Sequence, residues 1–253
     1  MIHLTSVSRR SEVNSEDYAA HTPIISNLKT WKFTKPVTLL VGENGSGKST
    51  LLELIASSAG SITISGEDTY REETESLLKL VWSIRTKKGF YFKARDYSDF
   101  IERLQTIKRE TREILAEIEA RDPHSWEALP HRNTLADLKR LYGDGLEFRS
   151  HGESFLDLFQ ARFQPGGLYI LDEPEAPLSP ARQLTLISMI KEMIEEDAQF
   201  IIATHSPILM AFPGAEILEL RDGVLHQTRF DELEHVTLTR DFLQNPERYL
   251  RHL

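Results

Sequence analysis

The sequence predicts an α/β fold, with a mostly parallel sheet flanked by helices, antiparallel β elements near the N-terminus and an inserted helical subdomain. Two observations lead to this prediction. Apolar runs of strand length alternate with helical stretches through most of the chain. Polar clusters directly follow several of these runs, at the edge where an open parallel sheet places its ligands. We expect a single domain over residues 1–253, with the helical subdomain at residues 96–165.

The individual elements follow from local patterns. Residues 1–41 predict short strands and turns that end in the buried strand VTLLV, and a helix begins at Lys48. Four more strands are expected in SITISG, KKGFYFKA, LYILDEPE and QFIIATHS. A helix is expected from Pro180, with Ser179 as its N-cap. The segment AEILELRDGVLHQTRF predicts a hairpin that turns at Asp222-Gly223.

The helical subdomain contains one long amphipathic stretch, from Tyr97 to Arg121, and Asp122-Pro123 ends it. We expect its apolar stripe to face the core, within a compact helical lobe; a partner-binding helix is the alternative. A second helical stretch, SHGESFLDLFQARF, stops at Pro165. The stripe recurs at three- and four-residue steps and consists of Phe100, Ile101, Leu104, Ile107, Ile114, Leu115 and Ile118.

Composition excludes several classes of function. The chain has no cysteine, which excludes disulfides, thiolate metal sites and cysteine nucleophiles. Its formal net charge of −9 argues against broad adhesion to DNA or anionic membranes, so nucleic-acid binding is compatible only through a local basic patch and is otherwise unsupported. No apolar run approaches the ~18 residues of a membrane helix, and the polar N-terminus does not resemble a signal peptide. We expect a cytoplasmic protein without direct membrane insertion.

The stretch VGENGSGKST matches the complete motif G-x-x-x-x-G-K-[ST]. Its glycines allow successive backbone N–H groups to turn toward an anion, and the following helix points its positive end at the same place. Lys48 adds a charge that reaches the β- and γ-phosphates, and the Ser49 hydroxyl is placed to ligate Mg²⁺. A glycine-rich turn before an ordinary helix is the alternative, but the complete motif between a strand and a helix favours a nucleoside triphosphate site.

We therefore expect a P-loop NTPase core. Without nucleotide, Lys48 is expected to point into a solvent-filled loop. The phosphate-binding residues predicted in this stretch are Gly42, Glu43, Asn44, Gly45, Ser46, Gly47, Lys48, Ser49 and Thr50.

The run LYILDEPE supplies the acids that a phosphate loop lacks. Asp172 leaves an apolar strand and is a candidate Mg²⁺ ligand, directly or through water. Glu173 points elsewhere, toward an attacking water, and is the candidate general base. Two solvated acids at a strand end are the alternative. The functional interpretation is favoured because the chain already carries a phosphate loop.

The phosphate loop, SHGES, LYILDEPE and IIATHS, in this order and spacing, resemble the nucleotide-binding domain of ATP-binding-cassette (ABC) ATPases over nearly the whole chain. The resemblance is to small stand-alone members near DNA-repair and chromosome-maintenance ATPases. It implies that Ser150, Gly152 and Glu153 match the serine, second glycine and glutamine of the family's LSGGQ signature, which contacts ATP held by a partner subunit. His151 replaces a glycine there. An N-capped helix start is the alternative for SHGES taken alone.

The same resemblance implies further roles. The segment EAPLSP lies where the family's loop crosses the dimer interface, and His205 matches the switch histidine that touches the γ-phosphate and the attacking water. Tyr18 lies at the distance of the family's adenine-stacking aromatic residue. The glutamine that links Mg²⁺ to the helical subdomain has no counterpart in FYFKARD, where Lys93, Arg95 and Asp96 are candidate replacements.

Three functions remain open. The first is a soluble ATPase with ATP and Mg²⁺ as ligands, which closes as a homodimer around two ATP molecules and acts on a separate partner. The second is the energising subunit of a membrane transporter, and the missing glutamine and altered signature weigh against it. The third is a nucleotide-gated module with slow turnover, and the intact Asp172-Glu173 pair weighs against it. We expect the first, with Lys48, Glu173 and His205 as its catalytic residues.

Overall fold

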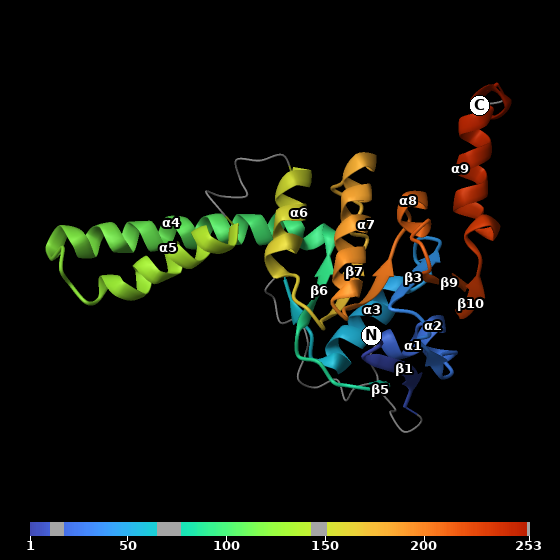
Figure 1. Ribbon diagram of the computed structural model, residues 1–253, viewed down its shortest axis with the longest axis horizontal. Helices are drawn as coiled ribbons and strands as arrows, with labels where there is room; N and C mark the ends of the chain where they lie inside the picture. Colours follow the sequence, from blue (N-terminus) through green and yellow to red (C-terminus); the bar gives the residue numbers. More distant parts are fainter. Residues whose placement is uncertain (11–17, 65–76, 143–150, 252–253) are drawn as a thin grey trace.

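The structure, a computed structural model, describes residues 1–10, 18–64, 77–142 and 151–251 (Figure 1). Its central sheet has seven strands in the order β10-β9-β3-β8-β7-β6-β4. The pairs are parallel except for the antiparallel hairpin of β9 and β10. The predicted α/β class with a mostly parallel sheet is thereby confirmed. The strands are β3 (Val37–Gly42), β4 (Ile62–Thr63), β6 (Gly89–Lys93), β7 (Leu168–Asp172), β8 (Gln199–Ala203), β9 (Glu216–Arg221) and β10 (Val224–Thr228).

A second, antiparallel sheet confirms the predicted N-terminal β elements. It consists of β2 (Trp31–Lys32), β1 (Leu4–Arg9) and β5 (Leu78–Trp82), in that order. The buried side chain of Gln199 in β8 joins it to the central sheet. Its Oε1 accepts from the backbone N–H groups of His3 and Leu4, both at 2.8 Å, and its Nε2 donates to the Leu4 carbonyl at 3.0 Å.

Helices and the small sheet cover the two faces of the central sheet. The small sheet and α3 (Lys48–Ala59) pack on one face, and α6 (His151–Arg162) and α7 (Pro180–Glu195) pack on the other. On the second face, rings from α6 and from the strands form one aromatic cluster, in which Phe92 of β6 contacts Phe155 and Phe159 of α6 edge to face. Because aromatic pairs of this kind are directional, they fix α6 over β6. The remaining short helices are α1 (Tyr18–His21), α2 (Pro23–Ser26), η1 (Ala94–Asp96), α8 (Pro207–Met210), η3 (Phe230–Glu232), α9 (Glu234–Gln244) and α10 (Pro246–Leu250).

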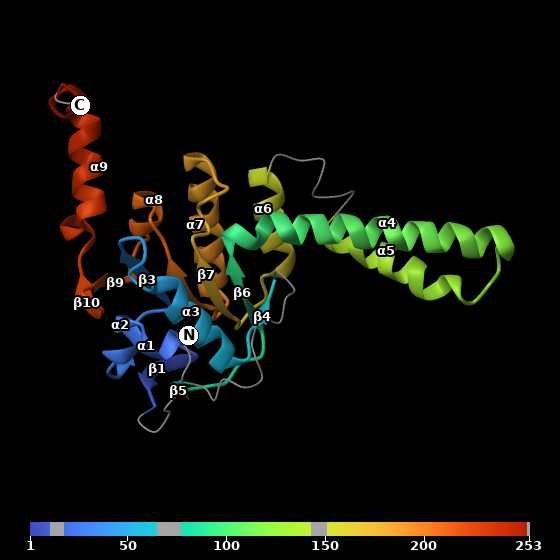
Figure 2. The ribbon, with the colours of Figure 1, turned by 180° about the vertical axis from the view of Figure 1, so that it is seen from behind.

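A helical arm projects from the body of the molecule (Figures 1 and 2). It consists of α4 (Tyr97–Arg121) and α5 (Ala128–Tyr142), which pack against each other. The predicted core-facing stripe and compact lobe are wrong beyond the first turns of α4. Phe100 is buried, but Ile107 and Ile114 are 44% and 42% exposed. The physical reason is that one neighbouring helix covers this stripe, and a single helix cannot enclose it as a core does.

The predicted hairpin after β8 is confirmed. Asp222 and Gly223 both have positive φ, 53° and 70°, as a two-residue type I′ turn requires. Ser179 occupies the N-cap position of α7 with Pro180 in the first turn, but its side chain makes no capping hydrogen bond. In the part of the chain that the structure describes, no helix is long and apolar enough to span a bilayer.

Candidate nucleotide site

The predicted phosphate loop joins β3 to α3, and two of its glycines are required by close packing. Gly42 has φ +147°, and a Cβ there would lie 2.6 Å from the carbonyl oxygen of Leu220 in β9. Gly47 has φ +99°, and a Cβ there would lie 2.6 Å from Cγ2 of Ile24. Neither position accepts a side chain without displacing its neighbours. The observed conformation of the loop therefore requires glycine at both positions.

Lys48 lies differently from the prediction. Its side chain is buried, and its Nζ donates to the carbonyl oxygens of Gly42 at 2.8 Å and Glu43 at 2.9 Å. The expectation that it points into solvent is therefore wrong, because the loop's own carbonyls capture the ammonium group. Burial lowers the pKa of Lys48, although the neighbouring carboxylates, led by that of Glu173, act in the opposite direction. The charge is already positioned inside the loop that would surround a phosphate.

Asp172 ends β7 with its side chain 2% exposed. One carboxylate oxygen, Oδ1, has no hydrogen-bond partner, while the Ser49 hydroxyl donates to the carboxylate. Burial raises the pKa of Asp172 to about 6. A buried carboxylate oxygen without a partner beside a serine hydroxyl suits a hard cation such as Mg²⁺.

The residues around Asp172 also fit the usual way in which Mg²⁺ is bound. Within the described ranges, no three His, Asp or Glu side chains gather into a metal cluster. Mg²⁺ in nucleotide sites is held by one or two protein oxygens together with substrate phosphates. Ser49 and Asp172 form a donor set of that size, so the site fits the ion as a companion of a bound phosphate.

We expect Asp172→Asn to stabilise the protein without nucleotide while abolishing ATP hydrolysis. A folded-state pKa above the ordinary 3.8 means that the folded chain binds the proton more tightly than the unfolded chain. The free energy of unfolding of the parent therefore rises as the pH falls from about 6 to about 4. At pH 7 the buried Asp172 carboxylate is ionised, and its burial lowers that free energy by at most roughly 3 kcal/mol. Urea unfolding at pH 7 and pH 4 should show the variant's advantage at the higher pH alone. An equal advantage at both pH values would contradict the assigned cause.

Glu173 follows with an uncommon backbone conformation. Its φ is +52°, and its backbone N–H donates to the carbonyl of Ala203 in β8 at 2.9 Å. A non-glycine residue in the left-handed region carries strain that the surrounding structure must hold, and such residues are frequent at functional sites. The Glu173 carboxylate comes directly after that of Asp172 along the chain. Its Oε1 lies 3.7 Å from Nε2 of His205, so the two predicted catalytic groups face each other.

His205 is fixed by a residue that the sequence did not single out for this role. Its backbone N–H donates to Oε1 of Glu175 at 2.6 Å, and burial raises the pKa of that carboxyl group. Burial lowers the pKa of His205, as does the nearby Lys48, so the imidazole is mainly neutral at pH 7. Nε2 of His205 is buried without a hydrogen-bond partner. The predicted interface loop and the predicted switch histidine are thus directly connected.

The place of the missing glutamine is occupied by an ion pair. Lys93, at the end of β6, is buried and stands in register with Asp172 of β7. Its Nζ pairs with Glu53 of α3, and Arg95, although 71% exposed, also lies 3.7 Å from that carboxylate. Of the three candidate replacements, Lys93 is therefore the one whose side chain lies inside the fold. Its charge is balanced by an acid from the helix that follows the phosphate loop.

The remaining predicted residues stay predictions. Tyr18 begins α1, but its side chain lies outside the described set, and so does Ser150 as a whole. Gly152 and Glu153 lie in the first turn of α6. The residues that the structure does bring together are Lys48, Ser49, Asp172, Glu173 and His205.

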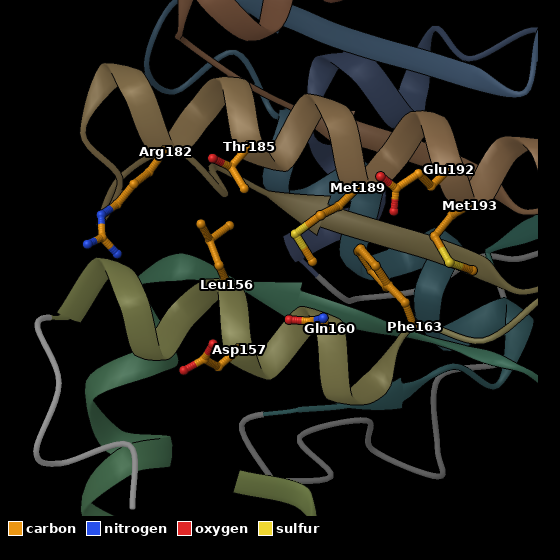
Figure 3. Close-up of a pocket in the computed structure, with 9 residues that line it drawn as sticks. All are labelled: Leu156, Asp157, Gln160, Phe163, Arg182, Thr185, Met189, Glu192 and Met193. Atoms are coloured by element: carbon orange, nitrogen blue, oxygen red, sulfur yellow. The ribbon is translucent and has the colours of Figure 1, made fainter. Parts of the chain in front are cut away.

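A groove of about 420 Å³ between α6 and α7 is not the phosphate site (Figure 3). Apolar side chains line much of it, among them Leu156, Phe163 and Met189. In Figure 3, Leu156 of α6 and Phe163, which directly follows α6, point toward α7, and Met189 of α7 points toward them. None of the phosphate-loop residues or of the acids after β7 lines the groove. The groove lies between α6, which begins within the predicted signature, and α7, which follows the predicted interface loop.

Comparison with known proteins decides the family. A family model described as "AAA domain, putative AbiEii toxin, Type IV TA system" matches residues 57–211, and a second, described as "AAA domain", matches residues 23–69. The first match covers more than half of the chain. The chain belongs to this AAA-domain family and is an ABC-type P-loop ATPase.

Proteins similar to this ATPase include ATP-binding proteins named for import. The cobalt import ATP-binding protein CbiO of Salmonella typhi is 26% identical over 87% of this chain and 83% of its own. The phosphonates import ATP-binding protein PhnC 1 of Ruegeria sp. (strain TM1040) is 24% identical over 95% of this chain and 92% of its own. These similarities agree with the motifs and confirm an ATP-binding domain of the ABC type.

Solved structures show the same fold. The ADP conformation of an ATP-binding cassette of an ABC transporter superposes with a TM-score of 0.50, at 16% identity, over 98% of this chain and 96% of that chain. An Smc head domain with an extended coiled coil, derived from Pyrococcus furiosus, also gives 0.50, at 14% identity, over 98% of the ATPase and 100% of that chain. At such identities the likeness concerns the fold alone.

Proposed function

We propose that the chain is a stand-alone, Mg²⁺-dependent ATPase whose two copies close around two ATP molecules and open after hydrolysis. One observation carries the proposal. Glu173 is held in a strained turn with its carboxylate beside His205, directly after the buried Asp172 and near Lys48. A potential base, an imidazole, a cation and a potential metal ligand therefore converge at one loop. This is the set of groups that phosphoryl transfer to water requires.

The roles follow from the chemistry of each group. The loop N–H groups and Lys48 hold the β- and γ-phosphates, which requires the ammonium to leave the carbonyls of Gly42 and Glu43. Glu173 accepts the proton of the attacking water. Neutral His205 orients that water or a γ-phosphate oxygen through its Nε2. Ser49 and Asp172 would hold Mg²⁺, which neutralises charge that develops on the phosphate oxygens.

The position of α6 supports a second copy. The aromatic cluster fixes α6 over β6, whereas the phosphate loop follows β3. Three strand spacings separate β6 from β3, which corresponds to roughly 14 Å across the sheet. The start of α6 is therefore displaced sideways from the phosphate loop of its own chain. An isologous pair would place each signature on the other copy's ATP.

We expect Ser150→Arg to leave ATP binding within about threefold of the parent and to abolish dimerisation and turnover. The added guanidinium side chain would occupy the space of the partner's γ-phosphate. ATP affinity by equilibrium dialysis, mass by light scattering and phosphate release should be measured on the same preparation. If the variant hydrolyses ATP at the parental rate, SHGES is only a helix start and the signature role is wrong.

Two alternatives have distinct tests. The similarity to CbiO and PhnC 1 favours a transporter subunit as the second candidate. Co-purification of a membrane protein with the chain at its natural expression level would establish that candidate. Steady-state turnover far below one per minute would favour a nucleotide-gated module. A partner of any of these kinds should be retained by a variant in which hydrolysis is blocked.

A further inference from the structure

The helix α9 begins at the nucleotide site. Its first turn is anchored by Leu233 and Val236, both buried. Between them, the ring of His235 lies 5.5 Å from the ring of His205, tilted by 57°. From this first turn α9 extends beyond the carboxyl edge of the central sheet, on the side opposite the α4–α5 arm (Figures 1 and 2).

One face of α9 continues outward from that histidine contact. At about 100° per residue, His235, Leu238 and Phe242 fall on the same side of the helix. Leu238 is 51% exposed and Phe242 is 36% exposed. Because the ring of His235 meets that of His205, the exposed apolar positions that follow it on this side of α9 continue a surface that begins at the nucleotide site. We call His235, Leu238 and Phe242 the α9 strip.

Two features of the α9 strip favour an apolar contact. The ring of Phe242 packs edge to face on Tyr249 of α10 at 5.8 Å, and the Tyr249 hydroxyl donates to Asp241. Two arginines of α9 and α10 are already paired, since Arg240 bonds Asp231 and Arg248 bonds Asp241. A partner that covers Leu238 would therefore not leave these charges unpaired, which would be costly.

We propose that the α9 strip docks on a second copy of this chain when two copies close over ATP. The inference rests on the proposed ATP-dependent dimer. The occupant follows from the origin of the strip, since a surface that starts at His205 borders the face that a second copy must cover to reach the γ-phosphate. His235 makes the contact sensitive to nucleotide, because His205 is the group that meets the γ-phosphate and its ring is packed against the root of α9. Each copy would then clamp the other.

The first test compares two leucines of the same helix. In a Glu173→Gln background with ATP and Mg²⁺, Leu238→Asp should raise the Kd of the dimer by on the order of tenfold or more, because it places a carboxylate in an apolar contact. Leu243→Asp is the matched control, since Leu243 is more exposed, at 71%, but lies on another side of α9. Its Kd should stay within about twofold of the parent. Sedimentation equilibrium gives the Kd, and binding of radiolabelled ATP shows that each monomer is intact.

The second test detects the contact by crosslinking and does not require a variant that weakens the dimer. The chain has no cysteine, so Leu238→Cys and Leu243→Cys each create a unique site for a benzophenone-maleimide photo-crosslinker. Leu238→Cys should give a product of twice the mass with ATP but not with ADP, and Leu243→Cys should give little of it.

The outcomes separate this inference from the proposed function. If the Glu173→Gln parent stays monomeric with ATP, both are overturned. If the parent dimerises while the two aspartate variants behave alike, or while Leu238→Cys crosslinks only within its own chain, the α9 strip is not part of the interface. The ATP-dependent dimer then stands and the inference is overturned.

Discussion

Lys48→Ala is expected to lower ATP affinity by at least about a hundredfold and to remove measurable hydrolysis. The change deletes the charge that meets the β- and γ-phosphates, and charge-assisted bonds to phosphate are among the strongest in proteins. It also leaves the carbonyls of Gly42 and Glu43 without their donor. We therefore expect a stability loss of roughly 1–3 kcal/mol, with the fold retained.

Isothermal titration with ATP and a phosphate-release assay check the first part, and urea unfolding checks the second. Lys35→Ala is the control, because Lys35 is exposed and precedes β3 at the edge of the sheet away from the loop. It should change neither affinity nor turnover. Equal ATP affinity in Lys48→Ala and the parent would refute the assignment of the loop.

Glu173→Gln is expected to lower turnover by roughly 10²–10⁴-fold while ATP still binds. The amide keeps the shape of the side chain but cannot take a proton from water. A rate loss of this size is typical when a general base is removed. Asp172 and Ser49 are unchanged, so the Mg²⁺ ligands remain. ATP then stays intact between two copies, and closure is trapped rather than prevented.

The trapped state has a direct readout in mass. A chain of 29.0 kDa should elute as a monomer without nucleotide and at about twice that mass with ATP and Mg²⁺, whereas ADP should have no effect. Light scattering during size exclusion measures this. Glu195→Gln, at the exposed end of α7, is the matched control and should hydrolyse ATP normally. A monomer with ATP, or a dimer that ignores nucleotide, would count against the proposed closure and leave the nucleotide site standing.

Part of the site was predictable because its residues are contiguous. The phosphate loop is ten residues long, and its function depends on its own backbone angles, on Lys48 and on the start of the next helix. The strand and acids of LYILDEPE are equally local. The boundaries of α3 and α4 also follow from local signals, since the expected starts at Lys48 and Tyr97 match the structure.

Orientation was less predictable than position. Sequence motifs place Lys48 at the loop but do not say which acceptor it uses when no phosphate competes, and the nearest acceptors are the carbonyls of Gly42 and Glu43. An amphipathic stripe likewise predicts that α4 is covered on one side without saying by what. In the structure α5 is the main neighbour of this stripe, and a single helix covers only part of it. Ile107 and Ile114 therefore remain exposed.

The sequence by itself determined that this chain binds a nucleoside triphosphate and which strand supplies the acids, because those properties belong to residues that are neighbours along the chain. Only the tertiary structure decided that Glu175 holds His205, that Lys93 pairs with Glu53 and that the ring of His235 meets that of His205. These contacts join residues 30 to 40 positions apart. No periodicity or short motif predicts a contact between residues so far apart in the sequence. Such a contact depends on how whole strands and helices are connected in the parallel sheet.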